Sequence, residues 1–376
     1  MFEWFKGYEE NRVLKELEDL LSMDIPYSRV LSSMCTYPHP IAVKAHIKFI
    51  RSNLGDPGLF PGTAELEKRL LVMLGELFGK RDLAGYISSG GTEGNIQAIR
   101  AARNMLCTCR GNIVVPESAH FSFLKIKDLL GIDVRKAGLD EEYRVDIGDV
   151  ERLVDDETFA IVGIAGTTEL GQVDDIKALS KLAIENNLFL HVDAAFGGFV
   201  LPFLNNNEFN FRIKGVCSLV ADPHKMGMAT IPSGAVLFRD SKYLEVLSVE
   251  TPYLTSSKQF TLTGTRPGTG VASAYAVLKH LGFEGMKKVV LECMRVTQIL
   301  KEEVESLGLE AVIDPVMNVV CFKCNARKVR EELMKRGWVV SCIRKPEAIR
   351  CVIMPHLTES AALEFVKVLK NVLHSL

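Results

Sequence analysis

The sequence predicts an α/β fold in which helices cover both faces of a mostly parallel sheet. Short, almost continuously apolar runs recur at residues 113–115, 160–164, 188–192 and 218–221. Segments with helical periodicity, such as 176–185, separate these runs. Strands that are buried on both faces are apolar throughout, whereas half-exposed strands alternate, so the runs indicate parallel strands alternating with helices. Ligands of such sheets bind at the carboxyl ends of the strands.

The N-terminal region is expected to contain one helix and a loop. Leucines at helical intervals among charged residues predict an amphipathic helix over residues 9–22, and a segment rich in Pro, Gly and Asn predicts a loop over 37–62. A helix over 64–78, a glycine-rich turn at 88–94 and a helix over 95–105 follow. We therefore expect an N-terminal segment, 1–62, followed by a large domain, 63–275.

The C-terminal region is expected to form a small α+β domain, 276–376. A strand at 233–239 and a polar loop at 250–270 end the large domain, and a long helical pattern follows at 271–307. Further strands are predicted near 316–322, 339–343 and 349–354, with helices at 326–336 and 360–373.

Composition is typical of a soluble globular protein. The 376 residues are 47% hydrophobic and 24% charged, with a net charge of −2, which argues against a nucleic-acid partner. No run reaches the roughly 18 apolar residues of a membrane span, and the N-terminus has no signal-peptide pattern. The nine cysteines lack the spacing of a disulfide framework, so we expect a cytoplasmic protein in a reducing compartment.

Two pairs of cysteines lie close together in the sequence, as metal ligands often do. Cys107 and Cys109 are too close together for a usual metal knuckle. Cys321 and Cys324 have CxxC spacing but no second ligand pair, and the residues around them favour a buried strand. No metal site is expected.

Asp193 and Lys225 are the most informative residues. Asp193 ends the apolar run 188–192, and Lys225 follows 32 positions later, directly after His224. A carboxylate in apolar surroundings requires a cation, and a partly desolvated lysine can supply the neutral amine of a Schiff base. Pyridoxal phosphate would satisfy both: its aldehyde bonds the lysine, and its protonated pyridine nitrogen pairs with the carboxylate.

Three further patterns suit the same cofactor. The turn 88–95 opens a helix, where free N–H groups and the Thr92 hydroxyl could bind a phosphate. His120, after the strand at 113–115, could stack on a flat ring, and the hydroxyls of 166–171 could contact a cofactor oxygen. Taken singly, a simple turn explains the two turn patterns about as well, and a histidine at a helix start explains His120 better.

Five motifs together resemble the group II pyridoxal-phosphate-dependent amino-acid decarboxylases of fold type I, and most closely the archaeal L-tyrosine/L-aspartate decarboxylases. They occur in the family's order: SSGGTEGN (88–95), ESAH (117–120), GTTELG (166–171), HVDAAFGG (191–198) and DPHKMG (222–227). The resemblance implies a fold-type I transferase with a mostly parallel seven-stranded sheet.

The resemblance also implies site roles, matched residue by residue. Lys225 would carry the Schiff base, Asp193 would pair with the pyridine nitrogen and His120 would stack on the ring. The remaining contacts would be Gly91, Thr92 and His224 with the phosphate, Thr168 with the ring oxygen, Ala195 beneath the ring, and Arg350 with the substrate α-carboxylate. Arg266 is a weaker candidate than Arg350 for the contact with the substrate.

Two departures from the animal members of the family leave the proton donor open. Met226 stands where those enzymes carry tryptophan, and the segment between Tyr253 and Arg266 is too short for their mobile loop with its tyrosine. His120 and Tyr253 are the remaining candidates.

The expected reaction is decarboxylation of an L-amino acid through an external aldimine and a quinonoid, converting tyrosine to tyramine, aspartate to β-alanine, or both. The resemblance implies a homodimer with sites near the subunit interface. The net charge and the lack of a long apolar run predict neither a nucleic-acid nor a membrane partner. Two alternatives remain: a lyase or tRNA-linked cysteine-forming enzyme of the same fold, and a non-catalytic effector-binding module.

Overall fold

A seven-stranded sheet forms the centre of the computed structural model, which describes residues 6–105, 111–206 and 208–376. Its strand order is β1-β7-β6-β5-β4-β2-β3. The strands are β1 (Ala84–Ser88), β2 (Asn112–Pro116), β3 (Asp133–Ala137), β4 (Thr158–Ile164), β5 (Phe189–Asp193), β6 (Val216–Ala221) and β7 (Gly234–Phe238). β7 runs antiparallel to both neighbours, and every other adjacent pair is parallel. The predicted mostly parallel sheet is therefore confirmed.

Both faces of this sheet are buried, as the apolar runs predicted. Along β5 and β4, successive residues enter opposite core clusters: Leu190 and Val192 pack on one face, whereas Phe189 and Val162 pack on the other. Helices α4 (Gly91–Met105), α5 (Ser122–Leu130) and α8 (Lys242–Glu245) cover one face. Helices α3 (Pro61–Leu77), α6 (Ile147–Leu153) and α7 (Ile176–Glu185) belong to the other.

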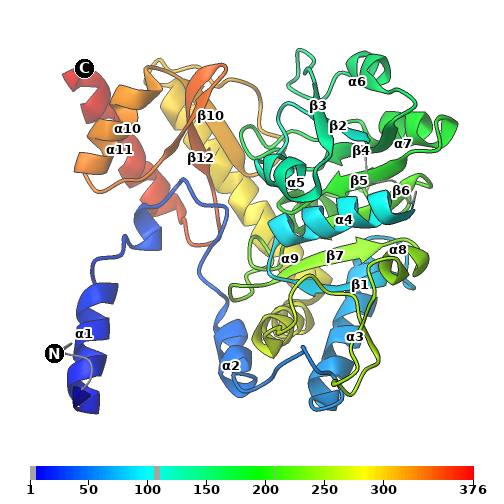
Figure 1. Ribbon diagram of the computed structural model, residues 1–376. Helices are drawn as coiled ribbons and strands as arrows, with labels where there is room; N and C mark the ends of the chain where they lie inside the picture. The colour runs from blue at the N-terminus through cyan, green and yellow to red at the C-terminus, as the bar shows by residue number, and fades with distance from the viewer. Residues whose placement is uncertain (1–5, 106–110, 207) are drawn as a thin grey trace.

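The helix α9 (Gly268–Glu305) runs from the large sheet to a smaller one (Figure 1). It is interrupted at Gly282, whose φ of 61° is not helical. The smaller sheet is antiparallel with order β10-β12-β11. Its strands are β10 (Val319–Lys323), β11 (Ser341–Arg344) and β12 (Glu347–Val352), with helices α10 (Ala326–Lys335) and α11 (Glu359–Ser375) packed on them.

Short elements complete the fold. A two-stranded ribbon joins β8 (Val249–Glu250) to β9 (Lys258–Gln259) within the predicted polar loop. Among the described residues, 3-10 turns lie at η2 (Tyr27–Arg29), η3 (Gly197–Phe199) and η4 (Leu201–Leu204).

The N-terminal segment differs from its prediction in one place. Helix α1 (Glu10–Leu21) occurs as expected and stands away from the rest of the chain (Figure 1). The predicted loop 37–62, however, contains helix α2 (Pro40–Lys48). Its start is defined by Pro40 in the first turn and by the His39 ring, which accepts a hydrogen bond from the N–H of Ile41. The prediction counted Pro40 as a loop residue, although a proline in the first turn is common at the start of a helix.

The same segment also joins the small sheet. Val30 pairs with Val339, and Leu31 accepts a hydrogen bond from the N–H of Val352 at 2.7 Å. Residues near position 30 therefore contact the C-terminal region before the chain reaches the large sheet at β1. Within the described ranges, no helix is long and apolar enough to span a membrane.

Candidate active site

A cavity of about 340 Å³ lies where the parallel strands β4, β5 and β6 end and α4 begins. Eight of the nine predicted site residues line it: Gly91, Thr92, His120, Thr168, Asp193, Ala195, His224 and Lys225. The structure thus brings together residues that are separated by up to 134 positions in the sequence. Its location agrees with the rule that ligands of α/β sheets bind at the carboxyl ends of strands.

The glycine turn before α4 leaves room for an anion. Gly90 has a φ of +156°, and a Cβ there would lie 3.0 Å from the His224 ring. A Cβ on Gly91 would lie 2.9 Å from the Ala195 Cβ. The N–H groups of the first helical turn have no preceding turn to accept their hydrogen bonds, and the helix dipole is positive here. Side chains larger than hydrogen at these two positions would therefore approach His224 and Ala195 too closely.

Asp193 is held by two hydrogen bonds. Its Oδ2 accepts from the Asn95 amide at 2.8 Å and its Oδ1 accepts from the N–H of Ala195 at 3.1 Å. The side chain is buried, yet it borders the cavity. A carboxylate fixed in this way can pair with a cation, such as a protonated ring nitrogen, that enters the cavity.

Lys225 lies beside a second carboxylate that sequence reasoning did not assign to the site. Its Nζ is 3.3 Å from Asp222 Oδ2, which also accepts a hydrogen bond from the N–H of Gly91 at 3.0 Å. The other oxygen, Oδ1, is buried and has no hydrogen-bond partner among the described residues. Asp222 opens the same DPHK motif as Lys225, but the motif alone does not show that the two side chains meet.

The two histidines are held neutral by burial. Burial is the largest cause that lowers the pKa of His120, and the same holds for His224. The N–H of Ser233 donates to His224 Nδ1 at 3.1 Å, so the proton of the neutral ring resides on Nε2, where it can be donated to a phosphate. His120 Nδ1 accepts from the N–H of Ser122 at 3.3 Å, which leaves its Nε2 as a donor.

Another cavity residue that the sequence reasoning missed is Ser118. Its hydroxyl is buried and has no partner in the described part of the chain. A bound oxygen atom would satisfy it. The donors around this cavity, namely a helix start, a serine, a neutral histidine, a lysine and a fixed carboxylate, fit the phosphate, aldehyde and pyridine nitrogen of pyridoxal phosphate.

Arg350 lies next to the cavity rather than in its lining. Its guanidinium donates to the backbone oxygens of Thr168 and Ser32, both at 2.6 Å. Nε has no partner, and no carboxylate oxygen of the described residues lies within 4.0 Å of the group. Burial lowers the pKa of Arg350. A buried guanidinium without a counterion is unusual, and a substrate carboxylate could serve as one.

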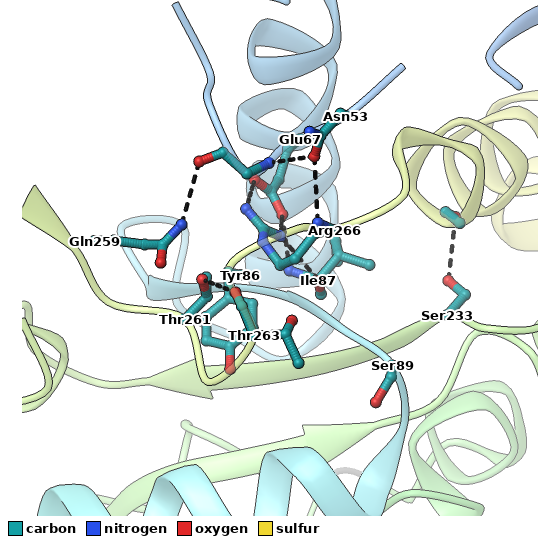
Figure 2. Close-up of polar contacts among 12 residues, drawn as sticks. Asn53, Glu67, Tyr86, Ile87, Ser89, Ser233, Gln259, Thr261, Thr263 and Arg266 are labelled. Atoms are coloured by element: carbon teal, nitrogen blue, oxygen red, sulfur yellow. Dashed lines mark hydrogen bonds and ion pairs between the residues drawn. The ribbon is translucent and has the colours of Figure 1, made fainter. Parts of the chain in front are cut away.

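Arg266 is committed elsewhere. Figure 2 shows its guanidinium directed at Glu67, with Nη1–Oε1 and Nη2–Oε2 distances of 2.7 and 3.1 Å. Nη1 also donates to the backbone oxygen of Ile87 at 3.0 Å. Its charge is therefore neutralised within the chain.

Tyr253, the other candidate for proton transfer, is 85% exposed and does not line the cavity of its own chain.

Of the two cysteine pairs, Cys321 and Cys324 lie among the described residues. Cys321 lies in β10 and is buried, as its strand pattern predicted. Cys107 and Cys109 lie outside the described residues. Within the described residues, no group of three His, Cys, Asp or Glu side chains could hold a metal ion.

Comparison with known proteins gives concordant matches. Residues 50–325 match the model of the "Pyridoxal-dependent decarboxylase conserved domain". The chain is 60% identical over 363 residues to a "Probable L-aspartate decarboxylase" of Archaeoglobus fulgidus, covering 96% of this chain and 99% of that protein. It is 56% identical over 373 residues to a "Probable L-tyrosine/L-aspartate decarboxylase" of Methanothrix thermoacetophila, covering 99% and 97%.

Solved structures show the same fold. The glutamate decarboxylase of Lactobacillus brevis superposes with a TM-score of 0.91 at 24% identity, covering 98% of this chain and 93% of that one. The sphingosine-1-phosphate lyase of Burkholderia pseudomallei superposes with a TM-score of 0.89 at 26% identity, covering 98% and 91%. Because the family match spans most of the sequence, the chain belongs to the pyridoxal-dependent decarboxylases and is an amino-acid decarboxylase that uses pyridoxal 5′-phosphate.

Proposed function

We propose that this enzyme decarboxylates L-aspartate, L-tyrosine or both, with its cofactor held through Lys225 and Asp193. The observation that carries the proposal is that these two side chains line one cavity together with the glycine turn that starts α4. The names of the archaeal relatives support the choice of substrates, since they include aspartate or both amino acids.

Other residues of the cavity are proposed to bind the parts of the cofactor. The start of α4, with Gly91 and Thr92, and His224 Nε2 would bind the phosphate. Asp193 would keep the ring nitrogen protonated, and the bound cofactor would supply an acceptor for the electrons released when the carboxylate leaves. His120 and Ala195 would contact the ring, and Thr168 would contact the ring oxygen.

Arg350 is proposed to orient the substrate. Thr168 and Ser32 hold its guanidinium beside the cavity through their backbone oxygens, and no carboxylate of the described residues neutralises its charge. A fixed cation can hold the α-carboxylate so that the bond to be broken stands perpendicular to the ring. An Arg350→Lys variant, which keeps the charge but loses the planar fork, should raise KM for every substrate.

A homodimer is proposed as the functional form. Helix α1 buries none of its residues in a single chain, and Leu14, Leu17 and Leu21 on it are 48, 56 and 69% exposed. Their spacing places them on one face of the helix. A second copy of the chain is proposed to cover this face. A reducing compartment such as the cytoplasm is proposed as well, because the seven described cysteines carry free thiols.

The direct test is to incubate the purified, cofactor-loaded enzyme separately with L-aspartate, L-tyrosine and L-glutamate and to measure CO2 and amine. We expect stoichiometric CO2 and β-alanine or tyramine. Keto acid without CO2 would refute decarboxylation of these substrates. A Lys225→Ala variant should lose both turnover and the absorbance of the cofactor–lysine Schiff base, whereas Lys328→Ala, a change of an exposed lysine on α10, should lose neither.

A further inference from the structure

A row of buried polar side chains leads from the interior of the sheet to the cavity. Ser218 on β6 and His191 on β5 are 0% exposed, and Asn95 on α4 is 1% exposed. Asp193, at the end of β5, is the last member of the row. Ser218 and His191 do not line the cavity, so they reach a ligand only through Asn95 and Asp193.

The hydrogen bonds of this row have one consistent direction. A carboxylate only accepts, so the Asn95 group that lies 2.8 Å from Asp193 is its Nδ2. The Asn95 Oδ1 therefore faces His191 Nε2, at 2.9 Å, and that nitrogen must carry the ring proton. His191 Nδ1 then accepts from the Ser218 hydroxyl at 2.7 Å.

Asn95 is fully satisfied by this arrangement. Its amide also donates to the buried Ser122 hydroxyl at 3.0 Å, so both amide hydrogens and the amide oxygen have partners. The orientation of the amide is therefore fixed from three sides. Because Ala195 fixes the second oxygen of Asp193, the whole carboxylate is held in one position.

The row carries a single charge. Burial lowers the pKa of His191 to about 4, even though the nearby Asp193 acts in the opposite direction. The imidazole is therefore neutral at physiological pH, and Asp193 is left without a cation from this side. A cationic histidine would instead compete with a ring nitrogen for the carboxylate.

We propose that Asn95, His191 and Ser218 are positioning residues that hold the Asp193 carboxylate toward the ring nitrogen of the cofactor. The inference rests on the proposed pairing of Asp193 with that nitrogen. Buried polar groups cost free energy unless each has a partner, and apolar side chains would fill the same space without that requirement. The row meets the cavity at Asp193. The orientation that its hydrogen bonds impose on the Asp193 carboxylate therefore matters for a ligand bound in the cavity.

The test compares the affinity of the cofactor-free enzyme for two ligands by absorbance titration. One ligand is pyridoxal phosphate, and the other is its analogue in which C–H replaces the pyridine nitrogen. The wild type should prefer the natural cofactor. His191→Phe and Ser218→Ala should reduce this preference, by about tenfold for His191→Phe, while binding of the analogue changes little. His191→Gln, which keeps a donor and an acceptor, should restore most of it.

Ser180→Ala is the matched control, since Ser180 is another buried serine of the large domain, whose hydroxyl accepts from the N–H of Gly215. It should leave the preference unchanged. Equal weakening of both ligands by His191→Phe and Ser218→Ala would assign these residues a structural role and overturn the inference. An Asp193→Ala variant that retains the preference would instead overturn the proposed pairing itself. If His191→Phe does not fold, Ser218→Ala decides the question, because it removes one oxygen atom.

Discussion

Replacing His191 by glutamine should remove a specific pH dependence of stability. The wild-type imidazole is fully buried with a pKa of about 4, whereas in the unfolded chain it titrates near 6.5. As the pH falls below about 6.5, the unfolded chain binds a proton that the folded protein excludes. The folded state is therefore destabilised progressively as the pH falls from about 6.5 to about 4.

The magnitude follows from these two pKa values. Relative to pH 8, the linkage relation gives a loss of about 2 kcal/mol at pH 5 and about 3 kcal/mol at pH 4 from this one side chain. Burial also lowers the pKa values of His120, His224 and His356. Those residues are present in both proteins, so their contributions cancel in the difference.

The assay is urea unfolding of both proteins without cofactor, at equal concentration, at pH 8 and pH 5. Glutamine cannot titrate, so we expect the wild type to lose about 2 kcal/mol more than His191→Gln between the two pH values. A constant offset between the proteins at both pH values would show that the native imidazole protonates as readily as the unfolded one. That result would refute the neutral hydrogen-bonded row as described.

Two further predictions concern the surroundings of the site. Glu67→Gln would leave the Arg266 guanidinium buried without its carboxylate, so it should lower the free energy of unfolding by about 3–5 kcal/mol. Glu65→Gln is the control: Glu65 lies on the same helix but forms an exposed ion pair with Arg69, so this change should leave Tm nearly unchanged. Gly91→Ala would place its Cβ 2.9 Å from that of Ala195, so it should weaken cofactor binding, which an absorbance titration measures. Adding Ala195→Gly to this variant should recover part of the affinity. Equal cofactor affinity in the wild type, the single variant and the double variant would contradict the close approach.

Much of the fold could be predicted because the buried strands carry their own signal. The strands β2, β4, β5 and β6 are mostly apolar, since helices cover them on both faces. The strands β1 and β3 were not predicted. They form the two edges of the sheet, and β3, with the sequence DVRKA, keeps Asp133 and Lys136 exposed. An edge strand with exposed charges has no periodicity that distinguishes it from a loop.

The site could be predicted as far as its motifs extend. Lys225, Asp193 and the glycine turn stand in short segments whose residue types fit one cofactor, and the structure brings them together. Asp222 stood in the same motif but was not assigned, because one residue type in one motif does not show which neighbour it contacts. The surroundings of Arg350 were beyond reach for a similar reason, since its partners are backbone oxygens of Ser32 and Thr168, far away in the sequence.

The polar row behind Asp193 shows why sequence reasoning stops there. A histidine and a serine inside apolar strands look like isolated exceptions, and nothing local connects them. They become partners because the register of β5 against β6 sets His191 opposite Ser218 and Asp193 opposite Val220. Side chains alternate between faces, so residues 191 and 193 emerge on the same side of the sheet, where α4 supplies Asn95 between them. A slip of one residue in this pairing would separate the histidine from the serine. The orientation of the carboxylate is thus set by the same strand pairing that builds the core.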